Sequence, residues 1–327
     1  MANDSPALTS KSQFYDNTMV SSYKECPRRY QIRHKLGWRS QGTAMPLIFG
    51  LSWHAGMDAV WTYAPKLPSG ELADIALMQF LETWEAEGMP ARPDLEQLEA
   101  LGNRNPSVAH EMIVNYIAAR GAMLREAKLV ACEQPFAVPL PGATDVWYIG
   151  RLDKVIEYNG QTLVIEHKTT SEYKKDGGFK SLYIESWYSD SQVKGYQFGG
   201  AMFFPDLSQV WIDAALVHKT VHDAFRFVPV AHQQPLLQEW LRDTLDWVKR
   251  IQGDAERNYF PKNESACIGK YGACPFLDIC RTTADPAKLA GPPPGYILDR
   301  WEPFETLGLA KLIGDKKGAE GADVPRS

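Results

Sequence analysis

The feature that most constrains the fold is an Asn-Gly pair that separates two apolar segments. Residues 146–158 and 162–168 are rich in β-branched and aromatic residues, which favour strands, and Asn159-Gly160 lies between them. This dipeptide is typical of a two-residue hairpin turn, because both of its residues adopt positive φ readily. The sequence therefore predicts two antiparallel strands with a defined register.

That register brings two carboxylates together. Asp153 and Glu166 are equally distant from the turn, so they lie opposite one another, and cross-strand partners are about 5 Å apart. Two carboxylates this close repel unless a cation lies between them. Lys168 is on the same face as Glu166, because strand side chains alternate. Such a set suits metal-assisted phosphodiester hydrolysis, although a solvated hairpin with a cross-strand ion pair would show the same pattern.

The rest of the chain predicts an α/β fold with a central mixed sheet flanked by helices. Ser21 or Ser22 is expected to cap the first helix, and Pro135 indicates a bulge or an edge in its strand. Helices are predicted at 21–34, 47–63, 71–87, 106–128, 186–204 and 233–256, with a short one within 296–313, and further strands at 129–140, 210–218 and 224–230.

Four segments are expected along the chain: a helical region at 1–128, a catalytic core at 129–260, a cysteine-rich loop at 261–290 and a linker and tail at 291–327. The end of the tail, from Gly314, is small and charged and is predicted to be disordered.

Composition limits the classes of function. The 327 residues carry a net charge of −5, so any grip on nucleic acid must come from a local basic patch. No apolar run is long enough to span a membrane and the N-terminus shows no targeting pattern, so the cytoplasm is the expected location, or the host cytoplasm for a phage protein. Five cysteines without a signal peptide favour metal or cluster ligation over disulfides.

Four of those cysteines form a split pattern. Cys267, Cys274 and Cys280 lie in a Gly- and Pro-bearing loop, and Cys26 lies far upstream. Four thiolates suit an iron–sulfur cluster or zinc. Free thiols in a loop are the alternative, and Cys132, in an apolar stretch, is expected to pack in the core.

The hairpin segments GRLDKV and VIEHKTT resemble the GRIDxx and DYKT segments of RecB-family nucleases, in the PD-(D/E)XK superfamily. Further motifs occur in the family's order: a Gly-x3-His helix at 50–54, a strand glutamate at Glu133, and a Gln-x3-Tyr helix at 192–196. Glu166 stands where many relatives have aspartate, which the superfamily's name allows. The resemblance implies a restriction-endonuclease-like fold.

The same resemblance implies a metal site. His54, Asp153, Glu166 and the main-chain carbonyl of His167 would hold Mg²⁺ or Mn²⁺, and an imidazole ligand tilts the preference toward Mn²⁺. A lone histidine on an apolar helix is otherwise more often a core residue, so the assignment of His54 depends on the motif.

Three more side chains receive roles from the resemblance. Lys168 would be the catalytic base or an electrostatic group, and Gln192 and Tyr196 would orient the substrate or Lys168. An i, i+4 spacing occurs on any helix face, and Glu133 could equally pair with a basic residue.

The cysteine pattern resembles that of AddB-type helicase–nuclease subunits and CRISPR-associated exonucleases. It implies a 4Fe-4S cluster held by Cys26, Cys267, Cys274 and Cys280, which staples the two ends of the chain together. The first two late cysteines are spaced more widely here than in the usual family pattern.

The expected function is a metal-dependent exonuclease acting on single-stranded or free-ended DNA in recombination, repair, or phage- or CRISPR-related processing. The chain lacks a phosphate-cradling GxxxxGK[ST] motif, so the resemblance is to the CRISPR-associated and phage-borne members. The acidic composition leaves room for a helicase or recombination protein as a partner that supplies DNA affinity. Basic stretches at 28–35 and 173–180 are candidate phosphate contacts, with a solvated helix face or loop as the equal alternative. Residues 171–185 are expected to be a mobile loop near the DNA. A catalytically idle DNA-binding scaffold and a zinc-stapled protein without nuclease activity are the alternatives.

Overall fold

A computed structural model describes residue 8 and residues 12–174, 178–269 and 272–309. The chain divides into two compact units. Unit 1 holds the residues up to 42, residues 135–151 and those from 233 onward, and unit 2 holds residues 43–134 and 152–232. Strands β3 (Lys128–Pro139) and β4 (Val146–Tyr158) both run from one unit into the other. The four segments expected from the sequence stay a prediction.

The strands of unit 2 form a mixed sheet. The second half of β4 is antiparallel to β5 (Gln161–Thr170), β5 is parallel to β6 (Leu207–Leu216), and β6 is antiparallel to β7 (Phe225–Val230). β5 reads as a buried strand, with Leu163, Val164 and Ile165 fully covered. The predicted α/β fold with a mixed central sheet is confirmed.

The hairpin turn lies where the sequence predicts it. Asn159 and Gly160 have φ of 50° and 72°, so both occupy the left-handed region that a type I′ turn needs. The register pairs Lys154 with Ile165, and the next residues along the two strands are Asp153 and Glu166. A local turn rule thus fixes which carboxylates come together.

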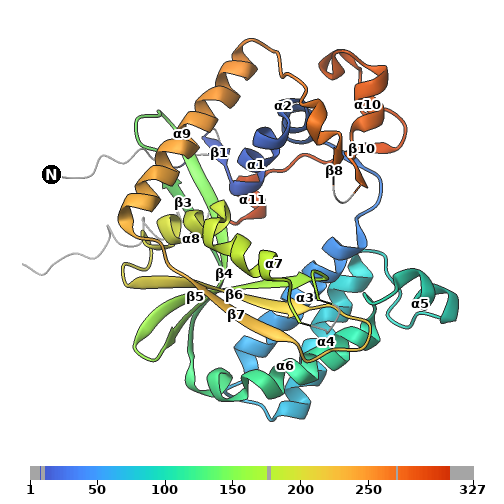
Figure 1. Cartoon of the computed structure of the whole chain (residues 1–327), viewed down its shortest axis with the longest axis vertical. Helices are drawn as coiled ribbons and strands as arrows, with labels where there is room; N and C mark the ends of the chain where they lie inside the picture. Colours follow the sequence, from blue (N-terminus) through green and yellow to red (C-terminus); the bar gives the residue numbers. More distant parts are fainter. Residues whose placement is uncertain (1–7, 9–11, 175–177, 270–271, 310–327) are drawn as a thin grey trace, which may run out of the picture. The chain divides into compact units, whose positions relative to one another are not determined.

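Helices cover both faces of this sheet (Figure 1). On one face lie α3 (Met45–Tyr63), α4 (Ser69–Ala86) and α6 (Pro106–Glu126), with the short α5 (Leu95–Leu101) joining the last two. Their apolar sides and the strands share one core, which includes Trp53, Phe80, Ile113, Ile165 and Val217. No helix of the described residues is long and apolar enough to cross a membrane.

The other face carries two shorter helices where one helix from 186 to 204 was predicted. α7 (Ser181–Ser186) runs into a 3-10 turn, Trp187–Ser189, and α8 is Ser191–Gly200. Asp190 separates them because it is extended and its carboxylate caps α8, accepting from the Gln192 N–H at 2.7 Å. The predicted loop 171–185 is therefore helical from Ser181 onward, and residues 175–177 lie outside the described residues.

Unit 1 contains both ends of the described chain. Its first helix, α1 (Asn17–Glu25), begins earlier than predicted, because Asp16 rather than Ser21 or Ser22 caps it, accepting from the Met19 N–H at 2.7 Å. Cys26 and Pro27 then break the helix before α2 (Pro27–Tyr30) and a π-helical turn (Gln31–Lys35). The long α9 (Gln234–Glu256) follows the sequence prediction closely.

Short elements complete unit 1. The segment predicted as a helix within 296–313 forms strand β10 before the short α11, and residues 310–313 and the tail from Gly314 lie outside the described residues. The short elements are β1 (Gln13–Tyr15), β2 (Trp38–Ser40), a 3-10 turn (Glu264–Ala266), β8 (Ile268–Gly269), β9 (Gly272–Ala273), α10 (Leu277–Thr282), a 3-10 turn (Pro286–Lys288), β10 (Tyr296–Leu298) and α11 (Pro303–Thr306).

Pairing between these elements links distant segments. β1 runs parallel to residues 146–148 of β4, and β2 pairs antiparallel with β10. Residues 38–40 and 296–298, near opposite ends of the chain, therefore share main-chain hydrogen bonds.

Candidate active site

Asp153 on β4 is held from two directions within unit 2. It is 7% exposed, and its Oδ2 accepts a hydrogen bond from the main-chain N–H of His167 on β5 at 3.0 Å. The same oxygen lies 3.1 Å from Nδ1 of His54 on α3. The predicted approach of His54 to the acidic hairpin is thus present in the structure.

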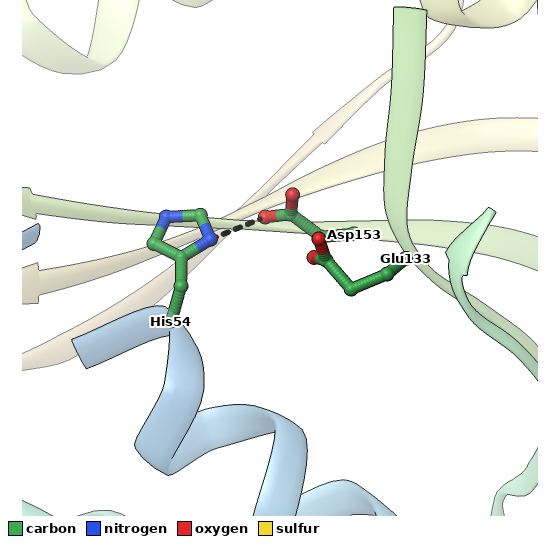
Figure 2. Close-up of side chains that lie close together, drawn as sticks. All are labelled: His54, Glu133 and Asp153. Atoms are coloured by element: carbon green, nitrogen blue, oxygen red, sulfur yellow. Dashed lines mark ion pairs between the residues drawn. The ribbon is translucent and has the colours of Figure 1, made fainter. Parts of the chain in front are cut away.

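A third acidic side chain joins them. Ligand atoms of His54, Glu133 and Asp153 all lie within 4.8 Å of one another, and Figure 2 shows the three side chains turned toward a common point. Glu133 has a φ of 51°, in the left-handed region that non-glycine residues rarely occupy. Backbone strain of this kind often accompanies functional sites. The sequence offered Glu133 only as a weak motif match.

Glu166 on β5 is 2% exposed and has two oxygens with different surroundings. Oε1 lies 2.5 Å from the ammonium nitrogen of Lys168 and accepts from Gln192 Nε2 at 3.3 Å. Oε2 is buried and has no hydrogen-bond partner among the residues that the structure describes. A buried carboxylate oxygen without a partner is costly, so a metal ion bound to this oxygen would be stabilising.

Gln192 and Tyr196 lie on one face of α8. Gln192 Nε2 donates to the Tyr196 hydroxyl oxygen at 2.6 Å as well as to Glu166. The Asp190 cap sets the start of α8, which places this face over β5. The pair therefore reaches the acidic centre through Glu166.

The charges of the site perturb one another. Burial acts to raise the pKa of Asp153, but the positive charges of His54, Lys154 and Lys168 outweigh it and hold that pKa below its usual range. Burial and the adjacent charge of Asp153 raise the pKa of Glu166. The carboxylates in turn raise the pKa values of His54 and Lys168, although burial opposes both shifts. Two buried carboxylates are thus only partly compensated by the side chains around them.

The donor set fits a divalent cation. Carboxylate oxygens are the ligands that Mg²⁺ and Mn²⁺ prefer, and one imidazole is compatible with Mn²⁺. The unpartnered oxygen of Glu166 and the converging His54, Glu133 and Asp153 give such an ion a place to bind.

A buried ion pair behind the site was not predicted from the sequence. Lys154 is fully buried on β4, and its ammonium lies 2.7 Å from Oδ1 of Asp58. Cys132 is half-buried beside this pair rather than packed in an apolar core, and burial raises its pKa to about 12. The available signal was the position of Asp58, four residues after His54 on the same helix face.

The four cysteines singled out in the sequence line one pocket of unit 1. They are Cys26, Cys267, Cys274 and Cys280, with the apolar Phe276 and Leu277 beside them. Burial raises the pKa values of Cys274 and Cys280, and the neighbouring sulfurs act in the same direction. A bound metal would stabilise the thiolate forms of these side chains, so this donor set fits a thiolate-ligated metal centre.

Several basic side chains of the stretch 28–35 already have hydrogen-bond or ion-pair partners within unit 1. Arg28 is buried, and its guanidinium donates to the carbonyls of Phe260 and Ala284. Arg29 pairs with Glu25, and Arg33 pairs with Asp299. In the second stretch Lys180 pairs with Glu172, and Lys175 lies outside the described residues. Arg28 therefore has a structural position rather than one open to phosphate.

The family model described as the PD-(D/E)XK nuclease superfamily matches residues 18–281, a span that includes every candidate site residue. Among solved structures, a candidate exonuclease from Eubacterium rectale is similar, with 15% sequence identity, coverage of 87% of this chain and 91% of that chain, and a TM-score of 0.48. The curated proteins gave no match.

Proposed function

This chain belongs to the PD-(D/E)XK nuclease superfamily, and from that premise we propose that it is a divalent-metal-dependent deoxyribonuclease. In the finer assignment it is an exonuclease of the RecB-like type that acts on single-stranded or free-ended DNA in recombination, repair, or phage- or CRISPR-related processing. Its partner would be a helicase or recombination protein, and it would be located in the cytoplasm.

One observation carries this proposal. Side chains from three separate elements, His54, Glu133 and Asp153, converge within 4.8 Å, and Glu166 beside them has a buried oxygen without a partner among the described residues. A buried carboxylate oxygen without a partner is unusual in a purely structural ion pair, because most buried polar atoms are satisfied. This arrangement supports a divalent-metal site.

The residues divide the work of phosphodiester hydrolysis. His54, Glu133, Asp153 and Glu166 would hold the metal, together with the main-chain carbonyl of His167. A divalent ion there would neutralise the carboxylates, polarise the phosphate and make a bound water more acidic.

Lys168 and α8 would complete the site. Lys168 is close enough to Glu166 to orient an attacking water by hydrogen bonding or to balance negative charge that develops on the phosphate. Gln192, held by Tyr196, would fix the rotamer of the Glu166 carboxylate.

We further propose a 4Fe-4S cluster on Cys26, Cys267, Cys274 and Cys280. The four cysteines line one pocket of unit 1 together with Phe276 and Leu277, and four cysteine thiolates are the usual ligands of such a cluster. Zinc would take the same donor set and is the alternative.

The test is a cleavage assay on protein purified without oxygen. End-labelled single-stranded and duplex DNA are incubated with Mn²⁺ or Mg²⁺ and wild-type, Glu166→Ala or Lys168→Ala protein. Glu157→Ala is the matched control, because it removes an exposed carboxylate from the same hairpin.

Wild type and Glu157→Ala should shorten labelled DNA from its ends only when metal is present, and the two site variants should not. If folded, metal-binding wild type leaves every DNA intact, the enzyme assignment fails and a DNA-binding scaffold replaces it. A circular DNA is incubated beside the labelled ones, and internal cuts in it would overturn the exonuclease assignment alone.

A further inference from the structure

His167 separates Glu166 from Lys168 on β5, so its side chain points to the opposite face of the sheet. The ring is fully buried. Its register partner on the parallel strand β6 is Asp213, which is 1% exposed, and Nδ1 of His167 lies 3.4 Å from Oδ2 of Asp213. This is an ion-pair distance only, because neither ring nitrogen of His167 has a hydrogen-bond partner among the described residues.

Asp213 is itself fixed by stronger bonds from α6. The Tyr116 hydroxyl donates to Oδ2 at 2.6 Å, and Arg120 pairs with Oδ1 at 2.9 Å. The Tyr116 oxygen accepts in turn from the indole N–H of Trp61 at 3.0 Å, and the Arg120 guanidinium lies 3.7 Å from the centre of the Phe227 ring. The carboxylate opposite His167 therefore has little freedom to move.

Packing alone does not account for this network of buried polar groups. A buried ion pair is often no more stable than apolar side chains of the same volume. The His167 ring lies against this carboxylate, with Nδ1 3.4 Å from Oδ2 of Asp213, and its centre is 6.2 Å from that of the Tyr116 ring. An apolar side chain at position 167 would fill the same space and would not need the polar groups of Tyr116, Asp213 and Arg120 beside it.

The backbone of His167 links this network to the metal site. Its main-chain N–H donates to Oδ2 of Asp153 at 3.0 Å, and its peptide links directly to Glu166. Fixing the His167 ring therefore also limits movement of the His167 backbone, whose N–H is bonded to Asp153.

We propose that Asp213, with Tyr116 and Arg120, is a positioning residue of the metal site, which acts through His167 to fix Asp153 and Glu166 at ligand distance. The inference rests on the proposed function, because it concerns the same metal site. Residues that orient metal ligands typically contribute 10- to 100-fold in metal affinity.

The test measures metal binding directly. Mn²⁺ dissociation constants are determined for wild type, Asp213→Asn and Tyr116→Phe from the electron paramagnetic resonance signal of free Mn²⁺. Thermal unfolding of the same proteins is followed in EDTA. Both variants should bind Mn²⁺ about 10-fold more weakly. Cleavage measured over the same Mn²⁺ range should need about 10-fold more metal to reach half of its maximal rate.

Tyr23→Phe is the matched control. It removes a buried hydrogen bond of the same kind, from Tyr23 to Asp254 at 2.7 Å, but in unit 1. It should lower the unfolding temperature and leave Mn²⁺ affinity unchanged. Tyr116→Phe keeps the shape of its side chain, so it decides the matter if Asp213→Asn does not fold.

Unchanged Mn²⁺ affinity in folded Tyr116→Phe would overturn this inference and leave the nuclease proposal standing. Wild-type protein that binds no Mn²⁺ and no Mg²⁺ would overturn the metal site and the inference together.

Discussion

The ammonium nitrogen of Lys168 lies 2.5 Å from Oε1 of Glu166, two residues earlier on the same strand. In the structure Lys168 thus compensates a carboxylate that a metal would also bind. Its role in the metal-loaded protein can be separated from that of the ligands by a substitution that removes the charge and keeps the volume.

Lys168→Met should lower the cleavage rate about 10²- to 10⁴-fold at saturating metal, the range expected for loss of a proton-transfer or electrostatic group. Mn²⁺ binding should not weaken, because the Lys168 ammonium no longer competes with the metal for the Glu166 carboxylate. Single-turnover cleavage and Mn²⁺ titration measure the two effects. Lys128→Met, which removes an exposed lysine on β3, is the control. Equal cleavage by both variants would remove Lys168 from the mechanism.

Glu166→Gln should raise the unfolding temperature in EDTA. Burial and Asp153 raise the pKa of Glu166, so its ionised form costs folding free energy at a pH above that pKa. A neutral amide of the same shape avoids this cost, which is the usual trade between stability and activity. With Mn²⁺ added the order should reverse, because only wild type gains stability from the ion. Calorimetry at pH 8 with and without Mn²⁺ tests both halves, and a lower unfolding temperature in EDTA would contradict the account.

Asp58→Ala should destabilise the protein by about 3–5 kcal/mol, because it leaves the fully buried Lys154 without its partner. Replacing both partners, in Asp58→Ala/Lys154→Met, should recover most of that loss. Urea unfolding of the two proteins gives the comparison. A double variant no more stable than Asp58→Ala would show that the cost has another source.

Cys26→Ser should abolish bound iron and the visible absorbance of the anaerobically purified protein. Cys132→Ser should retain both, because Cys132 lies outside the cysteine pocket and belongs to unit 2. Iron and sulfide assays on the two proteins decide between a cluster and the alternatives. Zinc in place of iron in the wild type would overturn the 4Fe-4S proposal and keep the thiolate site.

Much of the acidic centre could be predicted because it depends on local rules. The Asn159-Gly160 turn sets the hairpin register, and the register places Asp153 beside Glu166 and leaves Lys168 on the same face. Helix ends were harder to place: Asp16 and Asp190 cap helices that the apolar pattern alone starts at the wrong residue.

The sequence by itself determined the mixed α/β pattern, the hairpin and the types of side chain that can hold a metal, since turn chemistry and strand alternation act over a few residues. Only the tertiary structure decided that Glu133 joins His54 and Asp153, and that Asp213 lies opposite His167. Those pairings depend on how separate strands and helices pack. A buried carboxylate is stable only where that packing supplies a donor or a cation, and no local pattern shows which distant residue will do so.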